Sequence, residues 1–259
     1  MIALLASFVT ISTPFVPSNG WAVDSDGSIY GVLGENSNKV SRLIRFSNQN
    51  GTLKESFRFP QKFDGILEIM PIPEGILVAD YEGGFLGLIK RDGKIVWQTK
   101  TRYPAVVRPN EKGIVHLLFG GGRFFFKTSD SSEVEPILDR DGKELALDDI
   151  IDFAPMASGE IYAVDSDGNL ILINSNRIAK KFSTAKTQRL LSTSKGGVLA
   201  LQNNQLIRVT PTGQKITLWS LPKPDTEATI KRTADGRIAI ASNQGLKGVI
   251  YILDRSVEK

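Results

Sequence analysis

Three oxygen-bearing side chains, Asn19, Glu68 and Asp152, carry the most suggestive chemistry in this sequence. Each lies seven or eight residues before a glycine in a predicted hairpin turn. Carboxylate and amide oxygens are ligands that hard cations take, and zinc also binds carboxylates. The three residues therefore predict a divalent cation site, for calcium or zinc, if the fold brings them together. The alternative is that polar residues at strand starts simply face water.

Other kinds of catalytic chemistry are restricted by composition. The chain has no cysteine, which excludes disulfides, thiolate metal sites and a cysteine nucleophile. Its single histidine, His116, lies in an apolar run, so no histidine pair or Ser-His-Asp triad has an obvious basis within the chain. We therefore assign His116 a structural role, name no catalytic residue, and expect no cofactor other than that cation.

The motif Asp-Ser-Asp-Gly occurs twice, at Asp24–Gly27 and Asp165–Gly168. It begins like the calcium loop of an EF-hand, which also needs further oxygen ligands and a glutamate at position twelve. Counted from Asp24, position five is Ser28 and a β-run follows; counted from Asp165, position twelve is Asn176. Both copies are therefore interpreted as tight turns, one in the first hairpin of its repeat and the other in the second.

The elements that must position these residues are short strands. Between Ile150 and Phe182, four apolar runs alternate with three turn signals rich in Gly, Asn, Asp and Ser. The runs are Ile150–Pro155, Glu160–Val164, Leu170–Ile173 and Ile178–Phe182. This pattern is typical of four strands joined by hairpins into an antiparallel meander.

The same unit recurs along the chain. The first hairpin glycine of each repeat falls at Gly27, Gly75, Gly113, Gly159, Gly197 and Gly236. All-strand repeats of this length indicate propeller blades. The sequence thus predicts an all-β, six-bladed β-propeller of four-stranded antiparallel blades. Counting back from each glycine gives the expected channel-facing positions, which are Asn19, Glu68, Val106, Asp152, Leu190 and Thr229.

The two ends of the chain are predicted to share one blade. The last repeat, Ala228–Lys259, shows three good strands, and Ser7–Thr13 is rich in β-branched residues. We expect this N-terminal strand to pair antiparallel with Val249–Leu253 and to close the ring. Residues 1–15 have a second interpretation as a signal remnant, although no Lys or Arg precedes Lys39. Residues 16–259 are expected to form a single propeller domain.

Composition and charge also bear on the class of protein, its location and its partners. Hydrophobic residues make up 41% of the chain and charged residues 23%, which suits a globular core, and no segment has membrane-spanning length. Export to the periplasm or cell exterior is the preferred location, with the cytoplasm as alternative, and we expect a monomer. The net charge is only +4, and one basic cluster stands out: Arg177, Lys180, Lys181, Lys186 and Arg189. Because only Phe182 is interleaved for base stacking, nucleic acid is not the expected partner.

The repeats resemble known propeller families. Asn19–Tyr30 together with Arg45–Gly51 resembles an NHL-type repeat, Ile161–Gly168 echoes it, and Gly93–Trp97 resembles a blade of pyrroloquinoline-quinone-type propellers. In gluconolactonase-like propellers a divalent ion in the central channel is held by Glu, Asn and Asp and activates a water or a substrate carbonyl. That resemblance would assign the role to Glu68, Asn19 and Asp152. The family's Glu-Gly-Pro stretch is absent around Glu68, and Phe rather than Gly follows Asp152.

Three functions follow from these observations, because a propeller fold does not by itself fix function. The first is a non-enzymatic binding scaffold that presents one disc face to a protein or small ligand. Its expected contact residues are Tyr81, Glu82, Arg123, Asn203 and Asn204. The alternative is a metal-dependent lactonase or esterase-like hydrolase that uses Asn19, Glu68 and Asp152. The third is an NHL-type RNA-binding module.

Overall fold

The computed structural model describes residues 8–15, 17, 20–35, 40–50, 52–80, 84–101, 104–110, 114–120, 122–128, 133–174, 177–182, 186–193, 196–244 and 247–258. Its strands form six four-stranded antiparallel sheets, and the one described helix is the short 3-10 turn η2 (Arg255–Glu258). This is the six-bladed all-β propeller that the sequence predicts. No helix among these residues is long and apolar enough to cross a membrane.

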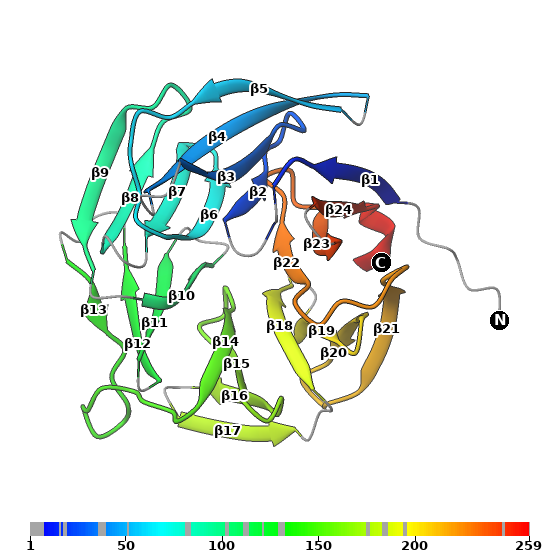
Figure 1. Ribbon diagram of the computed structural model, residues 1–259. Helices are drawn as coiled ribbons and strands as arrows, with labels where there is room; N and C mark the ends of the chain where they lie inside the picture. Colours follow the sequence, from blue (N-terminus) through cyan, green and yellow to red (C-terminus); the bar gives the residue numbers. More distant parts are fainter. Residues whose placement is uncertain are drawn as a thin grey trace. The chain divides into compact units, whose positions relative to one another are not determined.

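The strands group into two compact units, residues 1–98 with 227–259, and residues 99–226. The first unit holds three sheets (Figure 1). One contains β2 (Trp21–Val23), β3 (Ile29–Glu35), β4 (Val40–Gln49) and β5 (Thr52–Arg58). The next contains β6 (Ile66–Ile72), β7 (Gly75–Asp80), β8 (Phe85–Ile89) and β9 (Ile95–Lys100). The third joins β22 (Thr229–Arg232), β23 (Ile238–Gln244) and β24 (Lys247–Leu253) to β1 (Phe8–Thr13).

The second unit also holds three sheets, and each is a meander in chain order. One contains β10 (Pro104–Pro109), β11 (Val115–Phe119), β12 (Arg123–Lys127) and β13 (Glu135–Pro136). The next contains β14 (Ile150–Pro155), β15 (Ile161–Asp165), β16 (Leu170–Asn174) and β17 (Arg177–Phe182). The last contains β18 (Thr187–Ser192), β19 (Val198–Gln202), β20 (Gln205–Val209) and β21 (Lys215–Ser220).

The predicted sharing of one sheet by the two chain ends is confirmed. Strand β1 pairs antiparallel with β24 from Phe8 opposite Leu253 to Thr13 opposite Gly248. Its one fully buried hydrophobic residue, Ile11, packs in a core with Trp21 and Ile250. Ser7, the first residue of the predicted strand, lies outside the described residues.

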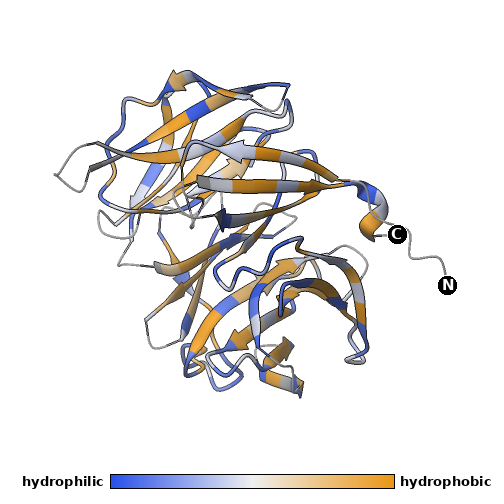
Figure 2. Ribbon diagram, turned by 45° about the vertical axis from the view of Figure 1, so that its right-hand side comes forward, coloured by the Kyte–Doolittle hydropathy of each residue, from blue (hydrophilic) through white to orange (hydrophobic). Residues whose placement is uncertain are grey.

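Burial separates the inner strands from the outer ones. Every residue of β7 and of β19 is buried, whereas residues of the fourth strands β5 and β9 are mainly exposed or half-buried. Hydrophobic residues recur along the strands of both units (Figure 2). The middle strands β7 and β19 are therefore packed inside their units, whereas the last strands β5 and β9 face solvent.

The Asp-Ser-Asp-Gly motifs form turns, as predicted. Gly27 closes the β2–β3 hairpin with a φ of 79°, and Gly168 closes the β15–β16 hairpin with a φ of 82°. In each, the glycine N–H donates to the carbonyl of the first aspartate. Positive φ is the conformation that glycine adopts at low cost. The predicted first-hairpin glycines at 27, 75, 159, 197 and 236 all lie at or beside such hairpins, and Gly113 lies outside the described residues.

A β-bulge interrupts the first strand of four sheets. The register shifts between Ile66 and Glu68, Pro104 and Val106, Ile150 and Asp152, and Thr187 and Arg189. A bulge re-aims the side chains around it. It also corrects one predicted position: Arg189, and not Leu190, is the residue of β18 that corresponds to Asp152 of β14.

Candidate functional site

Glu68 follows the bulge of β6 and is 5% exposed. Its Oε1 accepts a hydrogen bond of 3.1 Å from the N–H of Ile69 and forms a close ion pair with Nζ of Lys231. That ammonium group also lies 5.5 Å from the ring centroid of Trp21, whose indole N–H donates to the hydroxyl of Thr229 at 2.8 Å. Three first strands, β2, β6 and β22, thus meet in one buried polar cluster of the first unit.

Asp152 occupies the corresponding position in β14 and is fully buried. Its Oδ1 accepts hydrogen bonds from Arg108 at 2.8 Å and from the N–H of Phe153 at 2.9 Å. Its Oδ2 accepts one from the N–H of Leu190 at 2.8 Å. The carboxylate therefore ties together the first strands β10, β14 and β18 of the second unit.

These contacts bear on the predicted cation site. Glu68 belongs to the first unit and Asp152 to the second, and Asn19 lies outside the described residues. Each carboxylate already faces a cationic side chain, which a metal ion would have to displace. Among the described residues, no group of three or more His, Asp or Glu side chains could hold a metal ion. The site with Asn19, Glu68 and Asp152 stays a prediction.

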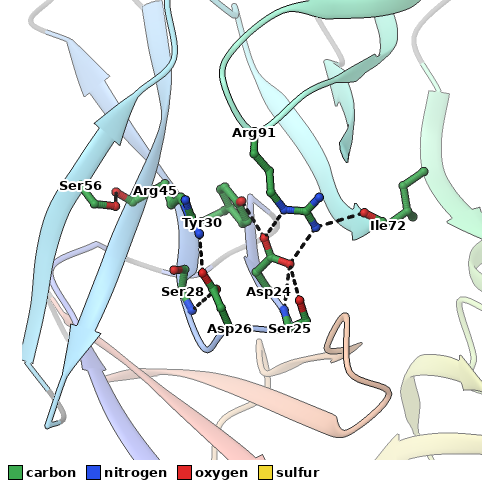
Figure 3. Close-up of polar contacts among 9 residues, drawn as sticks. All are labelled: Asp24, Ser25, Asp26, Ser28, Tyr30, Arg45, Ser56, Ile72 and Arg91. Carbon is green, nitrogen blue, oxygen red and sulfur yellow. Dashed lines mark hydrogen bonds and ion pairs between the residues drawn. The ribbon is translucent and has the colours of Figure 1, made fainter. Parts of the chain in front are cut away.

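Asp24, the first residue of the first Asp-Ser-Asp-Gly motif, anchors a second buried cluster in the first unit (Figure 3). Arg91, from the turn after β8, donates to both carboxylate oxygens at 2.8 and 2.9 Å, and the Tyr30 hydroxyl donates at 2.9 Å. Arg91 also donates to the carbonyls of Ile72 and Pro73. One carboxylate thus joins the first blade to the second.

The ionisation of this cluster follows from its contacts. Burial alone would raise the pKa of Asp24, but hydrogen bonds from Arg91, the Ser25 N–H and Tyr30 outweigh it and lower the pKa to about 2. Burial and the neighbouring carboxylate raise the pKa of Tyr30. Asp24 therefore stays charged at any ordinary pH. Because it is only 1% exposed, it serves as a link between the first and second blades and not as a ligand site.

His116 lies on β11, with Nδ1 3.3 Å from the carbonyl oxygen of Ile114. Burial lowers its pKa to about 4, so the ring is neutral at pH 7. Its cross-strand neighbours are Arg108 and Phe126. No ion pair between the ring and a carboxylate occurs among the described residues, and the structural role of His116 stays a prediction.

A pocket of about 420 Å³ opens in the second unit, at the end where first strands begin and second hairpins turn. Its walls come from the bulged residues Ile151 of β14 and Gln188 of β18, and from Asp167 and Gly168 of the β15–β16 hairpin. The rest of the lining consists of Ser166, Lys186, Thr187, Arg189 and Thr226, of which Lys186 and Arg189 are cationic. Its volume falls within the range of small-molecule sites.

The basic cluster noted in the sequence divides between two places. Arg177, Lys180 and Lys181 lie on the outer strand β17, whereas Lys186 and Arg189 line the pocket at the start of β18. Sequence reasoning missed the pocket because its walls come from separate hairpins and strands. The available signal was the second Asp-Ser-Asp-Gly motif, which ends 18 residues before Lys186.

Three of the five predicted partner contacts, Arg123, Asn203 and Asn204, lie at second hairpins of the second unit. Arg123 begins β12 after the second hairpin of its sheet, with its guanidinium 3.8 Å from Glu144. Asn203 and Asn204 form the β19–β20 turn, with φ values of 46° and 65°. Asn204 accepts hydrogen bonds from the N–H groups of Leu221 and Asp225. Tyr81 and Glu82 lie outside the described residues.

Comparison with known proteins supports the fold alone. No protein-family model and no curated protein matches the chain. A gluconolactonase from Xanthomonas campestris is similar over 96% of this chain and 90% of its own, with 9% identity and a TM-score of 0.62. A virginiamycin B lyase from Staphylococcus aureus covers 96% and 99%, with 12% identity and a TM-score of 0.57. The BBS1N structure, in complex with ARL6DN, covers 98% and 99%, with 12% identity and a TM-score of 0.56.

Proposed function

We propose that this protein is a non-enzymatic binding scaffold, which uses the second-hairpin end of its blades to hold a protein or a small ligand. One observation carries the proposal: Glu68 and Asp152, the carboxylates best placed for metal chemistry, are each buried in an ion pair with Lys231 or Arg108. A cation could bind such a carboxylate only by displacing its basic partner, which would leave that charge without its contact.

The second-hairpin end has the features of a binding surface. It carries a pocket lined by the cationic residues Lys186 and Arg189, together with Arg123 and the Asn203-Asn204 turn. Loops on a rigid scaffold are common places for recognition. One propeller of similar fold, BBS1N, has a structure in complex with ARL6DN, which supports a binding role for this protein.

A metal-dependent lactonase or esterase-like hydrolase is the second candidate. It is favoured by the equivalent positions of Glu68 and Asp152 directly after the bulges of β6 and β14, and by a gluconolactonase among the similar folds. In this function a cation would replace the basic partners and polarise a carbonyl group.

The effect of metal on the melting temperature distinguishes the two functions. A cation held with a dissociation constant of about 10 µM would add about 2.7 kcal/mol at 1 mM metal. That gain raises the melting temperature of a chain of this size by at least roughly 5 °C. For a scaffold we expect no such rise with calcium or zinc, and no hydrolysis of a δ-lactone or an aryl ester.

The control is the double variant Glu68→Gln with Lys231→Met, which removes both charges together and so leaves no buried ion unpaired. A metal-induced rise seen in the wild type and lost in this variant, together with lactone hydrolysis, would overturn the scaffold in favour of the hydrolase. If metal changes the melting temperature of the wild type and of the double variant by the same amount, the scaffold function is supported.

We further propose export as the location. The support is a similar fold in the extracellular domain of a putative hybrid two-component system from Bacteroides thetaiotaomicron, with 14% identity and a TM-score of 0.58. Fractionation of cells that express the chain with a C-terminal tag tests it. Recovery of the tagged chain only with cytoplasmic markers would contradict export.

A further inference from the structure

We infer that the last strand of the fourth sheet, β17, is a docking edge for an acidic, extended segment of a partner protein. This surface goes beyond the proposed function, because it follows one side of a sheet and is not the second-hairpin end. The inference depends on three features of β17: its free backbone edge, its uncompensated charge, and the placement of its side chains.

The backbone of β17 is paired on one side. The order of its sheet is β14-β15-β16-β17, so β16 is its one partner strand among the described residues. Figure 1 shows β17 at the outer edge of this sheet. Such an edge presents N–H and C=O groups with which a further strand can pair, and many extended peptides bind sheets in this way.

The charge of β17 distinguishes it from the other last strands. Three of its six residues are cationic, Arg177, Lys180 and Lys181, and none is acidic. Among the residues that the structure describes, no carboxylate forms an ion pair with any of the three. By contrast, β5 holds its own ion pair between Arg58 and Glu55, β9 and β21 each carry one lysine, and β1 carries no charge. Charge complementarity therefore selects an acidic partner for β17.

A bulge distributes the cations of β17 over both faces of the sheet. The register between β16 and β17 shifts after Ile178. As a result, Arg177 and Lys180 lie opposite residues of one face of β16, and Ile178 and Lys181 lie opposite residues of the other face. Ile178 is 44% exposed, so the second face offers an apolar contact beside a charge. A matching segment carries carboxylates on both faces and an apolar residue next to one of them.

Lys180 is held in place by the neighbouring sheet. Its Nζ donates to the carbonyl of Thr212 at 3.1 Å and lies 4.7 Å from the ring centroid of Phe182. Phe182 is itself buried in a core with Leu172. This aromatic residue, the one interleaved in the basic cluster, is therefore covered and cannot stack on a base. That favours an acidic protein segment over nucleic acid.

Basic residues on an edge strand also have a structural use, because they discourage pairing between identical chains. This use does not conflict with docking. Like charges repel a second copy of β17, whereas carboxylates opposite the same residues attract a different strand. The two uses differ in one measurable property, which is the affinity of the edge for an acidic strand.

The probe is a fluorescent octapeptide with blocked ends, Thr-Val-Glu-Glu-Thr-Val-Glu-Thr. Fluorescence anisotropy with the full chain at pH 7 and about 0.1 M salt measures its dissociation constant. We expect a value below about 1 mM, and binding that weakens at least about fivefold at about 0.5 M salt. The same peptide with glutamine in place of each glutamate should bind roughly tenfold more weakly.

The place and the mode of binding are measured by NMR on the isotope-labelled full chain. The acidic peptide should shift the amide signals of residues 177–182. It should also slow hydrogen exchange of the amides at the free edge, because a paired N–H is protected. A peptide of the same sequence with N-methyl groups on alternate amides keeps the charge but loses strand pairing. It should bind at least about fivefold more weakly.

Two triple variants of equal net charge assign the effect to β17. The first combines Arg177→Gln, Lys180→Gln and Lys181→Gln, and should weaken binding of the acidic peptide roughly tenfold. The second should change binding less than about twofold, because its charges lie on other sheets and salt screens them. It removes three exposed lysines of the first unit: Lys54→Gln, Lys90→Gln and Lys94→Gln.

Several results would overturn the inference. They are no binding at about 1 mM acidic peptide, equal binding of the glutamine or the N-methylated peptide, and amide shifts that lie outside β17. Tighter binding of a thymidine octanucleotide to the same edge would also overturn it, in favour of nucleic acid. Equal melting temperatures of the wild type and both triple variants show that a loss of binding is not a loss of folding. Metal-dependent lactone hydrolysis would overturn the scaffold function and leave the result for β17 standing.

Discussion

At the scale of single residues, the first unit contains ion pairs whose carboxylates are buried. The Asp24 side chain is 1% exposed and its partner Arg91 is 33% exposed, in a two-pronged contact with well-aligned hydrogen bonds. The geometry of such a pair determines most of its contribution to stability. Loss of one partner leaves the other charge without its main contact.

Substitution of Asp24 is therefore expected to be costly. Asp24→Asn should lower the free energy of unfolding by about 2 to 3 kcal/mol at pH 7, because Arg91 then lies beside a neutral amide. Urea unfolding measures this loss. Asp26→Asn is the matched control: that ion pair with Arg45 is exposed, so its loss should cost less than about 1 kcal/mol. Equal losses of unfolding free energy in the two variants would contradict the role of Asp24 as a link between blades.

The stability of the wild type should depend on pH through the same carboxylate, that of Asp24. The pKa of Asp24 is about 2 in the folded chain and 3.8 in its ordinary state, so the unfolded chain binds the proton first. Its contribution is complete above pH 3.8 and is lost as pH falls towards 2, a change of about 2 kcal/mol. We expect the stability difference between wild type and Asp24→Asn to shrink across this window in urea titrations.

His116 should make the stability of the protein depend on pH over a separate, higher range. Its pKa is about 4 when folded against 6.5 ordinarily, so the unfolded chain takes up the proton as pH falls from 6.5 to 4. Stability should therefore decrease over that range, on the order of 1 to 3 kcal/mol. In His116→Gln the urea midpoint should vary less between pH 6.5 and 4. A wild type and variant with parallel pH profiles would show that the ring does not titrate differently on folding.

At the scale of elements, β1 joins the last sheet by backbone pairing and by one buried side chain. Ile11 is 1% exposed, whereas its neighbour Thr10 points to solvent. Ile11→Ala should lower the free energy of unfolding by about 2 to 4 kcal/mol through lost burial and a cavity. Thr10→Ala, on the same strand, should change it by less than about 0.5 kcal/mol. Thermal and urea unfolding of both variants check the difference.

At the scale of the whole molecule, the first unit is assembled from both ends of the chain. Without residues 1–13, β24 would become an open strand edge, and such edges promote association. We propose that the full chain is a monomer, and we expect the truncated chain to form oligomers that grow with concentration in light scattering.

A peptide of residues 7–15 added in trans should restore the monomer, because it can add as a strand to the free edge. The same peptide with Ile11→Asp is the control, since its charge would enter the apolar core beside Trp21 and Ile250. A truncated chain that stays monomeric and equally stable would contradict the closing role of β1.

The sequence alone determined the repeat architecture, because alternating apolar runs and Gly- or Asn-rich turns are local signals. Strand bounds such as Ile150–Pro155, the turns at Gly27 and Gly168, and the pairing of the two chain ends all follow from such patterns. The shift from Leu190 to Arg189 escaped prediction, because a bulge changes the register without a clear mark in the sequence.

Only the tertiary structure decided which charges meet. Asp24 and Arg91 are 67 residues apart, and Glu68 and Lys231 are 163 residues apart, so no local pattern links them. The pocket depends in the same way on hairpins and bulges from neighbouring sheets. Strand patterns are local and repeat along the chain, whereas a charged side chain takes its partner, its pKa and its role from residues that only packing brings near.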